Sequence, residues 1–109
     1  MLHYTYIASD NTGTNGTALG VAGQDILINS IVFGLGADSV YATVYDETNP
    51  FTGATTNIAA KVSQPAAAAG KNYFPVANFG GGLHLGNGGN VVTNASQVTV
   101  IWDDLADLG

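Results

Sequence analysis

Charge is the property that this sequence has least of. Only 9% of the residues are Asp, Glu, Lys or Arg, against about 25% in a typical soluble domain. Charged side chains keep a monomer soluble and discourage association. So small a charged fraction predicts that much of the surface contacts other protein in an assembly. The alternative is a stable monomer whose surface consists of Asn, Thr, Ser and Gly.

Basic residues are scarcer still. The chain has two lysines, Lys61 and Lys71, no arginine, and a formal net charge of −6. Nucleic-acid binding draws most of its affinity from Lys and Arg that neutralise phosphates, and an anionic membrane surface attracts the same residues. We therefore expect neither nucleic acid nor membrane among the partners of this protein.

Cysteine is absent, which excludes a disulfide framework and a thiolate site for zinc or an iron–sulfur cluster. The first residues lack the basic segment and the long apolar segment of a signal peptide. No stretch approaches the 18 apolar residues that a membrane-spanning helix needs.

Residues that could perform catalysis are few and scattered. His3 and His84 lie far apart in the sequence, and no Gly-x-Ser-x-Gly motif or phosphate-binding glycine loop occurs. The acidic pairs 46–47 and 103–104 are adjacent in sequence, so on a strand each pair points to opposite faces. Residues 10–16 resemble a calcium loop but lack its glycine and glutamate positions. The sequence predicts no enzyme, no cofactor and no metal site.

Alternation of apolar and polar residues runs through most of the chain and predicts strands. Val40, Ala42 and Val44 would share one face of a strand, with Tyr41, Thr43 and Tyr45 on the other. Similar alternation covers residues 3–8, 57–63 and 98–103. The nearly continuous apolar segment 25–35 predicts either a long strand covered on both faces or a strand that crosses from the core to an interface.

Turn residues separate these segments. Residues 36–38 are short enough to close a hairpin between 31–35 and 40–46. Glycines at 80–82 and 86–89 leave only 83–85 as a strand between them, and residues 65–70 form one helical turn at most. We expect seven or eight antiparallel strands in a single β-sandwich or jelly roll over residues 1–109. Residues 1–10 and 103–109 are candidate extended arms, and an open five-stranded barrel is the alternative fold.

Aromatic residues and one histidine form the candidate interface. These residues are Tyr4, Tyr6, Tyr41, Tyr45, His84 and Trp102. Tyr and Trp are enriched in subunit contacts and in cores, but their rings also stack on sugars, so a carbohydrate-binding face is the alternative. His84 lies on a short glycine-flanked segment, and a three-fold axis would bring three copies of it together.

The layout of the chain resembles a known class of protein. The segments concerned are 18–23, 25–35, 39–46, 66–70, 73–76, 82–85 and 98–102. In length, strand rhythm and composition they are similar to small structural proteins of tailed bacteriophages, including phages of cyanobacteria and marine bacteria. The class that the chain resembles most is the capsid decoration or cement protein.

This resemblance implies a β-sandwich, often a homotrimer, that is made in the host cytoplasm and sits on the outer surface of the virion. There it would clamp neighbouring subunits of the major capsid protein. The acidic charge fits an exterior position independently, because packaged DNA would repel this chain. A carbohydrate- or receptor-binding module of a tail or head fibre is the alternative function.

Overall fold

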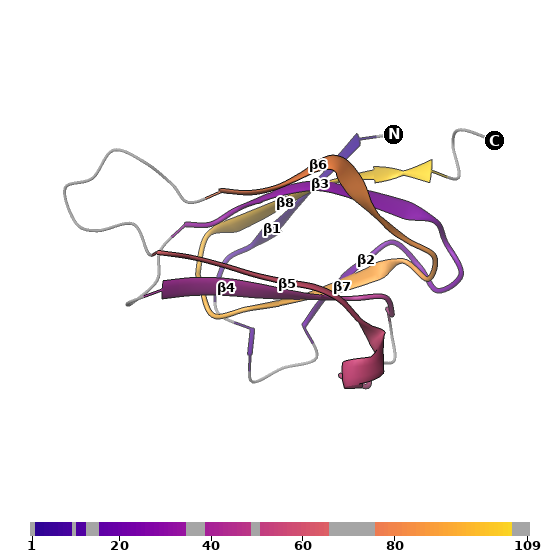
Figure 1. Cartoon of the computed structure of the whole chain (residues 1–109), viewed down its shortest axis with the longest axis horizontal. Helices are drawn as coiled ribbons and strands as arrows, with labels where there is room; N and C mark the ends of the chain where they lie inside the picture. The colour runs from indigo at the N-terminus through magenta and orange to yellow at the C-terminus, as the bar shows by residue number, and fades with distance from the viewer. Residues whose placement is uncertain are drawn as a thin grey trace.

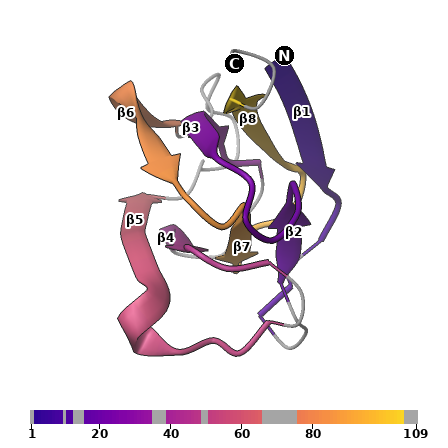
Figure 2. The same cartoon turned by 90° about the vertical axis from the view of Figure 1, so that its right-hand side faces the viewer.

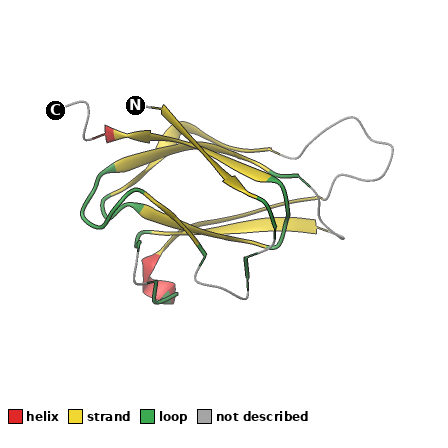
Figure 3. Ribbon diagram, turned by 180° about the vertical axis from the view of Figure 1, so that it is seen from behind, coloured by secondary structure: helices red, strands yellow, loops and turns green. Residues whose placement is uncertain are grey.

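The computed structural model describes residues 2–9, 11–12, 16–34, 39–48, 51–65 and 76–105. Strands dominate this part of the chain, as the ribbon in Figure 3 shows. The strands are β1 (Leu2–Ile7), β2 (Thr17–Leu19), β3 (Ile26–Val32), β4 (Ser39–Tyr45), β5 (Ile58–Pro65), β6 (Val76–Leu85), β7 (Gly89–Thr93) and β8 (Val98–Asp104), and the short 3₁₀ helix η1 (Thr55–Asn57) precedes β5.

Two antiparallel sheets of four strands face each other (Figure 1). The β1 sheet has the order β1-β8-β3-β6, and the β4 sheet has the order β2-β7-β4-β5. Consecutive strands alternate between the sheets except for β4 and β5, which are neighbours. Because β1 pairs with β8, β2 with β7, β3 with β6 and β4 with β5, the chain is one long hairpin wound across both layers. This is the jelly-roll winding, so the all-β sandwich prediction is confirmed and the open barrel is excluded.

The core lies between the sheets, where the inward residues of each strand meet. On β8 these are Val98, Val100 and Trp102, and on β4 they are Val40, Ala42 and Val44, as their alternation predicts. Each fully buried Val, Leu or Ile side chain contributes about 1.5–3 kcal/mol relative to exposure. The other buried apolar residues are Ile7, Leu19, Ile26, Ile28, Ile31, Phe33, Ala77, Leu85, Val91 and Ala95.

The expected hairpin between residues 31–35 and 40–46 is wrong. β3 and β4 belong to different sheets, and each pairs with two other strands. A turn signal shows that the chain reverses, but it does not show whether the next strand joins the same sheet. In a jelly roll most connections cross from one layer to the other. The turn residues 36–38 lie outside the described residues.

The expected short strand at 83–85 is also wrong, because β6 continues through the three glycines. Ile28 pairs with Leu83 and Ser30 with Asn78, so residues 79–82 stand opposite the single residue Asn29. This segment forms a wide bulge, visible as the raised part of β6 in Figure 1. The side-chain oxygen of Asn78 accepts a 2.9 Å hydrogen bond from the amide of Gly80 at the start of the bulge.

The termini are not extended arms where they are described. Residues 2–7 form β1, which pairs along its full length with β8, and Asp103 and Asp104 belong to β8. Both segments alternate, and each buries one row of side chains, which explains why they form paired strands of the β1 sheet. Residues 106–109 lie outside the described residues. Of the predicted helical turn at 65–70, Pro65 is the last residue of β5, and residues 66–70 lie outside the described residues.

Gly82 and Gly80 in the bulge of β6 provide a matched test of this geometry. Both have positive φ, +103° and +63°, but a Cβ at Gly82 would lie 2.5 Å from the Leu27 side chain, whereas nothing lies within 4 Å at Gly80. Gly80→Ala should lower the free energy of unfolding by about 1 kcal/mol, and Gly82→Ala by about 3 kcal/mol because it adds overpacking. Urea unfolding measures both, and equal losses would contradict the bulge.

Candidate interaction surface

The outer face of the β1 sheet carries three rows of side chains, which we call the tyrosine face. Residues opposite each other in antiparallel strands point to the same side of a sheet. The strand register therefore places these residues in rows: Leu2, Asp103, Leu27 and His84; Tyr4, Ile101, Ser30 and Asn78; and Tyr6, Thr99, Val32 and Val76.

Tyr4 and Tyr6 are the most exposed aromatic residues on this face. Their exposed fractions are 68% and 62%, and neither ring makes an aromatic contact or a side-chain hydrogen bond with any described residue. Leu2 and Val76, also on the tyrosine face, are exposed as well. Exposed apolar side chains gathered on one sheet face are typical of a surface that binds a partner.

The inner side of β1 explains why the tyrosines face outward. The ring of His3 stacks on that of Trp102, with 4.4 Å between centroids and 20° between planes. The indole Nε1 of Trp102 donates a 2.8 Å hydrogen bond to Thr5 Oγ1. Because His3 and Thr5 are held inward, the alternation of the strand turns Tyr4 and Tyr6 to solvent.

Tyr41 and Tyr45 lie on the opposite side of the molecule, on the outer face of the β4 sheet. The Lys61 ammonium lies 5.5 Å from the ring centroid of Tyr41, a contact worth about 0.5–1 kcal/mol at an exposed site. The ring of Phe51 meets Tyr45 edge to face, with centroids 4.9 Å apart. Both tyrosines are half-buried and have partners within the chain, unlike Tyr4 and Tyr6.

The loop that brings Phe51 to Tyr45 is organised by Glu47. Its carboxylate accepts hydrogen bonds from the amide and hydroxyl of Thr52, from the amide of Gly53 at 3.2 Å and from the side chain of Asn57 at 2.6 Å. Desolvation is the largest single influence and raises the pKa of Glu47, but the hydrogen bonds from Asn57, Thr52 and Gly53 together lower that pKa below its ordinary value.

The structure does not bring the six predicted interface residues together. Tyr4, Tyr6 and His84 share the tyrosine face, with His84 at the far edge of the sheet on β6. Its Nε2 lies 3.3 Å from Asp25 Oδ1, and both side chains are exposed. Trp102 is 7% exposed and belongs to the core, so it does not contribute to either outer face. Trp102 shares the alternation of Val98 and Val100, and its side chain therefore points into the core between the sheets.

Sequence reasoning missed the aliphatic members of the tyrosine face. Leu2 lies two residues before Tyr4 on β1, and Ile101 lies opposite Tyr4 on β8. Val76 lies on β6, the edge strand on the other side of the sheet. Leu2 shares the even-numbered parity of Tyr4 and Tyr6, and this signal was present in the sequence. Ile101 and Val76 could be placed on the same face only after the order of the strands was known.

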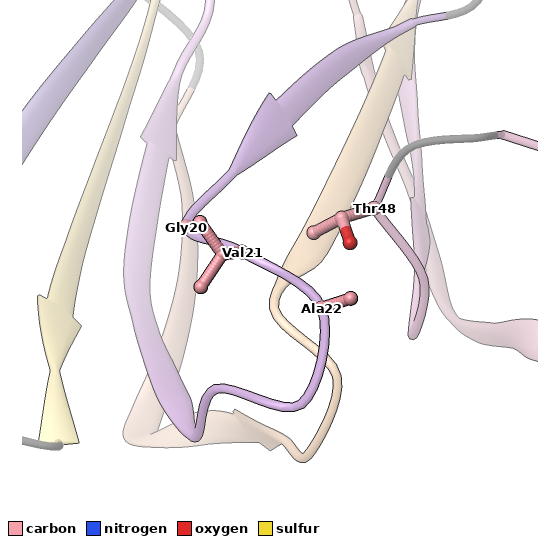
Figure 4. Close-up of a pocket in the computed structure, with 4 residues that line it drawn as sticks. All are labelled: Gly20, Val21, Ala22 and Thr48. Carbon is pink, nitrogen blue, oxygen red and sulfur yellow. The ribbon is translucent and has the colours of Figure 1, made fainter.

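A small depression lies at the β2–β3 end of the sandwich (Figure 4). Its volume is about 150 Å³, and Gly20, Val21, Ala22 and Thr48 line it. Small-molecule pockets usually occupy about 300–1,000 Å³, so this one is below that range, and its lining has a single side-chain hydroxyl. Within the described ranges no three His, Asp or Glu side chains gather as a metal site.

Comparisons with known proteins found no match for this chain. No protein-family model matches it, and no curated protein matches its sequence. Among the residues that the structure describes, no helix is long and apolar enough to cross a membrane. The tyrosine face is therefore the candidate site on physical grounds alone.

The lowered pKa of Glu47 predicts a pH dependence of stability. A depressed pKa in the folded state means that the ionised carboxylate stabilises the fold at any pH above the ordinary glutamate pKa, about 4.3. That contribution disappears as the pH falls through the lowered folded pKa, where both states become protonated. Glu47→Gln should therefore melt at a lower temperature than the wild type at pH 7, and this difference should shrink toward pH 3.

Thermal unfolding followed by circular dichroism across this pH range makes the measurement. Asp25→Asn, which removes an exposed carboxylate in contact with His84, is the control and should leave the melting temperature at pH 7 nearly unchanged. A Glu47→Gln variant as stable as the wild type at pH 7, or a difference that grows in acid, would contradict the role of Glu47.

Proposed function

We propose that this chain is a capsid decoration protein of a tailed bacteriophage that binds the outer surface of the major capsid lattice through the tyrosine face. The observation that carries the proposal is the contrast between the four tyrosines on the two sheets. Tyr41 and Tyr45 contact Lys61 and Phe51 of the same chain, whereas Tyr4 and Tyr6 are open to a partner.

The composition of the tyrosine face supports binding to protein. Tyrosine is enriched at the centres of protein interfaces, where charged residues are depleted. Asp103 is the single acidic residue in the three rows, and its Oδ2 accepts a 2.9 Å hydrogen bond from Asn29 Nδ2. A partner surface would therefore meet few unpaired charges when it covers this face.

The size of the face indicates weak individual contacts. Four strands about 4.8 Å apart make a sheet roughly 15–20 Å wide. The area of such a face is smaller than the area that each partner buries in a standard stable interface. A decoration protein on a repeating lattice makes many copies of the same contact, and linked copies bind more tightly through effective concentration. Weak contacts of this kind suit a protein that is added to an assembled shell.

Charge and fold are compatible with an exterior position on a virion. With a net charge of −6 and two lysines, the chain would be repelled by packaged DNA on the inner surface. The jelly-roll winding occurs in viral capsid domains and also in lectins. The fold alone does not choose between them, because function depends on the site, and the resemblance in layout favours the capsid.

Binding of a carbohydrate by the same face is the second candidate. Tyr4 and Tyr6 are exposed on one side of β1, and Thr99, Ser30 and Asn78 supply hydroxyl and amide groups on neighbouring strands. Exposed aromatic rings beside hydrogen-bonding side chains can hold the apolar and polar parts of a sugar. A receptor-binding fibre component would use the face in this way.

The test adds purified chain to virion shells that lack it and measures the bound copies per major capsid subunit. We expect saturation at a fixed ratio, with hundreds of copies on each shell, and at least a tenfold weaker apparent affinity for the Tyr4→Ser/Tyr6→Ser variant. Tyr41→Ser, which removes a tyrosine from the other outer face, is the matched control and should bind like the wild type.

Two outcomes would overturn the decoration proposal. Recovery of only a few copies per particle would indicate a tail or fibre component. Saturable binding to a glycan array that is lost in Tyr4→Ser/Tyr6→Ser, with no binding to shells, would favour the carbohydrate-binding function. Equal loss of shell binding in Tyr41→Ser would remove the tyrosine face from the proposal.

A further inference from the structure

We propose that the free edge of β1 pairs with β1 of a second copy of this chain, antiparallel and about a two-fold axis, so that two β1 sheets join into one continuous sheet. β1 is an end strand whose one strand neighbour is β8. Figure 2 shows it at the margin of the molecule. Its other edge carries backbone N–H and C=O groups that no strand of the described chain pairs.

The other three edge strands have features that hinder pairing, and β1 has none of them. β6 contains the bulge at residues 79–82, and β5 carries Lys61 and ends at Pro65. β2 has only three residues. Bulges, lysine, proline and short length are the means by which natural sheets protect their edges. The six residues of β1 include none of these features.

Beside β2, the edge of β7 is also covered. The side chain of Asn11 donates to the carbonyl of Val91 at 2.9 Å and accepts from the amide of Thr93 at 2.7 Å. The backbone of Asn11 donates to the carbonyl of Thr93 at 3.2 Å. Asn11 thus extends the pairing of the β4 sheet beyond the end of β2, and no described residue covers the edge of β1 in this way.

Charge favours a second copy as the occupant of this edge. Two chains of net charge −6 repel each other wherever carboxylates face, and β1 has no Asp, Glu, Lys or Arg. Its one histidine, His3, is stacked inward on Trp102. The β1 edge is therefore a place where two copies can approach without placing like charges in contact.

The alternation of β1 restricts the registers that two copies can adopt. Residues directly opposite in an antiparallel pair share a face, so the outward residues pair only with outward residues. The two registers that overlap most place Tyr4 opposite Tyr4 and Leu2 opposite Tyr6, or Tyr4 opposite Tyr6. Both make aromatic or aliphatic cross-strand pairs, each worth about 0.2–1 kcal/mol.

Such a pair has two-fold symmetry and is closed, since each copy offers one free β1 edge. It differs from the three-fold assembly that the resemblance to decoration proteins implies. It also joins two tyrosine faces into one larger surface with the tyrosines at its centre. The inference does not depend on the proposed function, because it is tested with the purified chain alone.

Sedimentation velocity from low micromolar to near-millimolar concentration tests the pairing. We expect a monomer–dimer equilibrium for the wild type and at least about tenfold weaker dimerisation for Tyr4→Glu, which brings two carboxylates together near the axis in either register. Val76→Glu adds the same charge to the same face at the opposite edge, on β6, and should dimerise like the wild type.

Cysteine cross-linking gives a second measurement that does not rely on a destabilising charge. The chain has no cysteine, so any disulfide reports the introduced positions. Tyr4→Cys lies on the axis in the first register, and in the second register position 4 of one copy of Tyr4→Cys/Tyr6→Cys lies opposite position 6 of the other. At least one of these two variants should form a disulfide-linked dimer on mild oxidation. Val76→Cys is the control and should remain monomeric.

Four results would overturn the β1 pairing. They are a wild-type monomer at every concentration, a trimer in place of a dimer, equal loss of dimer in Val76→Glu, and cross-linking of Val76→Cys but of neither β1 variant. Shell binding by a wild type that stays monomeric would leave the proposed function standing while removing this inference. A dimer that does not bind shells would do the reverse.

Discussion

The contact of Trp102 with His3 and Thr5 fixes the register of β1, and the two outward-facing tyrosines of the molecule depend on that register. Stacking on His3 and a hydrogen bond to Thr5 hold the inner side of β1 against the core at one register. A slip of one residue would turn every side chain of β1 to the other face. It would bury the tyrosines beside the core and expose the histidine and threonine, so the tyrosine face exists because this register is fixed.

The two outer faces of the sandwich differ because the chain covers one of them itself. The Glu47 loop carries Phe51 onto Tyr45, and Lys61 lies over Tyr41, so the β4 sheet already has contacts from its own loops. The β1 sheet has no loop of this kind among the described residues. The small charged fraction of the chain predicts a surface that contacts other protein. The β1 sheet is where we place that surface, because exposed apolar side chains and a free strand edge lie together there.

The sequence predicts strand positions and faces far better than strand neighbours. Alternation in β4 and β8 correctly identifies their buried rows, because side-chain direction depends only on local backbone geometry. The partner of β3 could not be predicted from residues 36–38, since the jelly roll pairs strands that are distant in sequence. Gly80 and Gly82 predict the end of a strand because glycine is rare within strands, but both lie inside β6, in its bulge. Trp102 was expected at an interface, and it lies in the core because its parity matches that of Val98 and Val100.

The register of β1 is the central claim, and ring accessibility in solution tests it most directly. Photochemically induced nuclear polarisation, an NMR method that detects rings open to a dye, would be applied at a concentration where the chain sediments as a monomer. We predict strong signals from Tyr4 and Tyr6, weaker ones from Tyr41 and Tyr45, and none from Trp102. A strong Trp102 signal with silent Tyr4 and Tyr6 would show that β1 does not hold this register and that the tyrosine face does not exist.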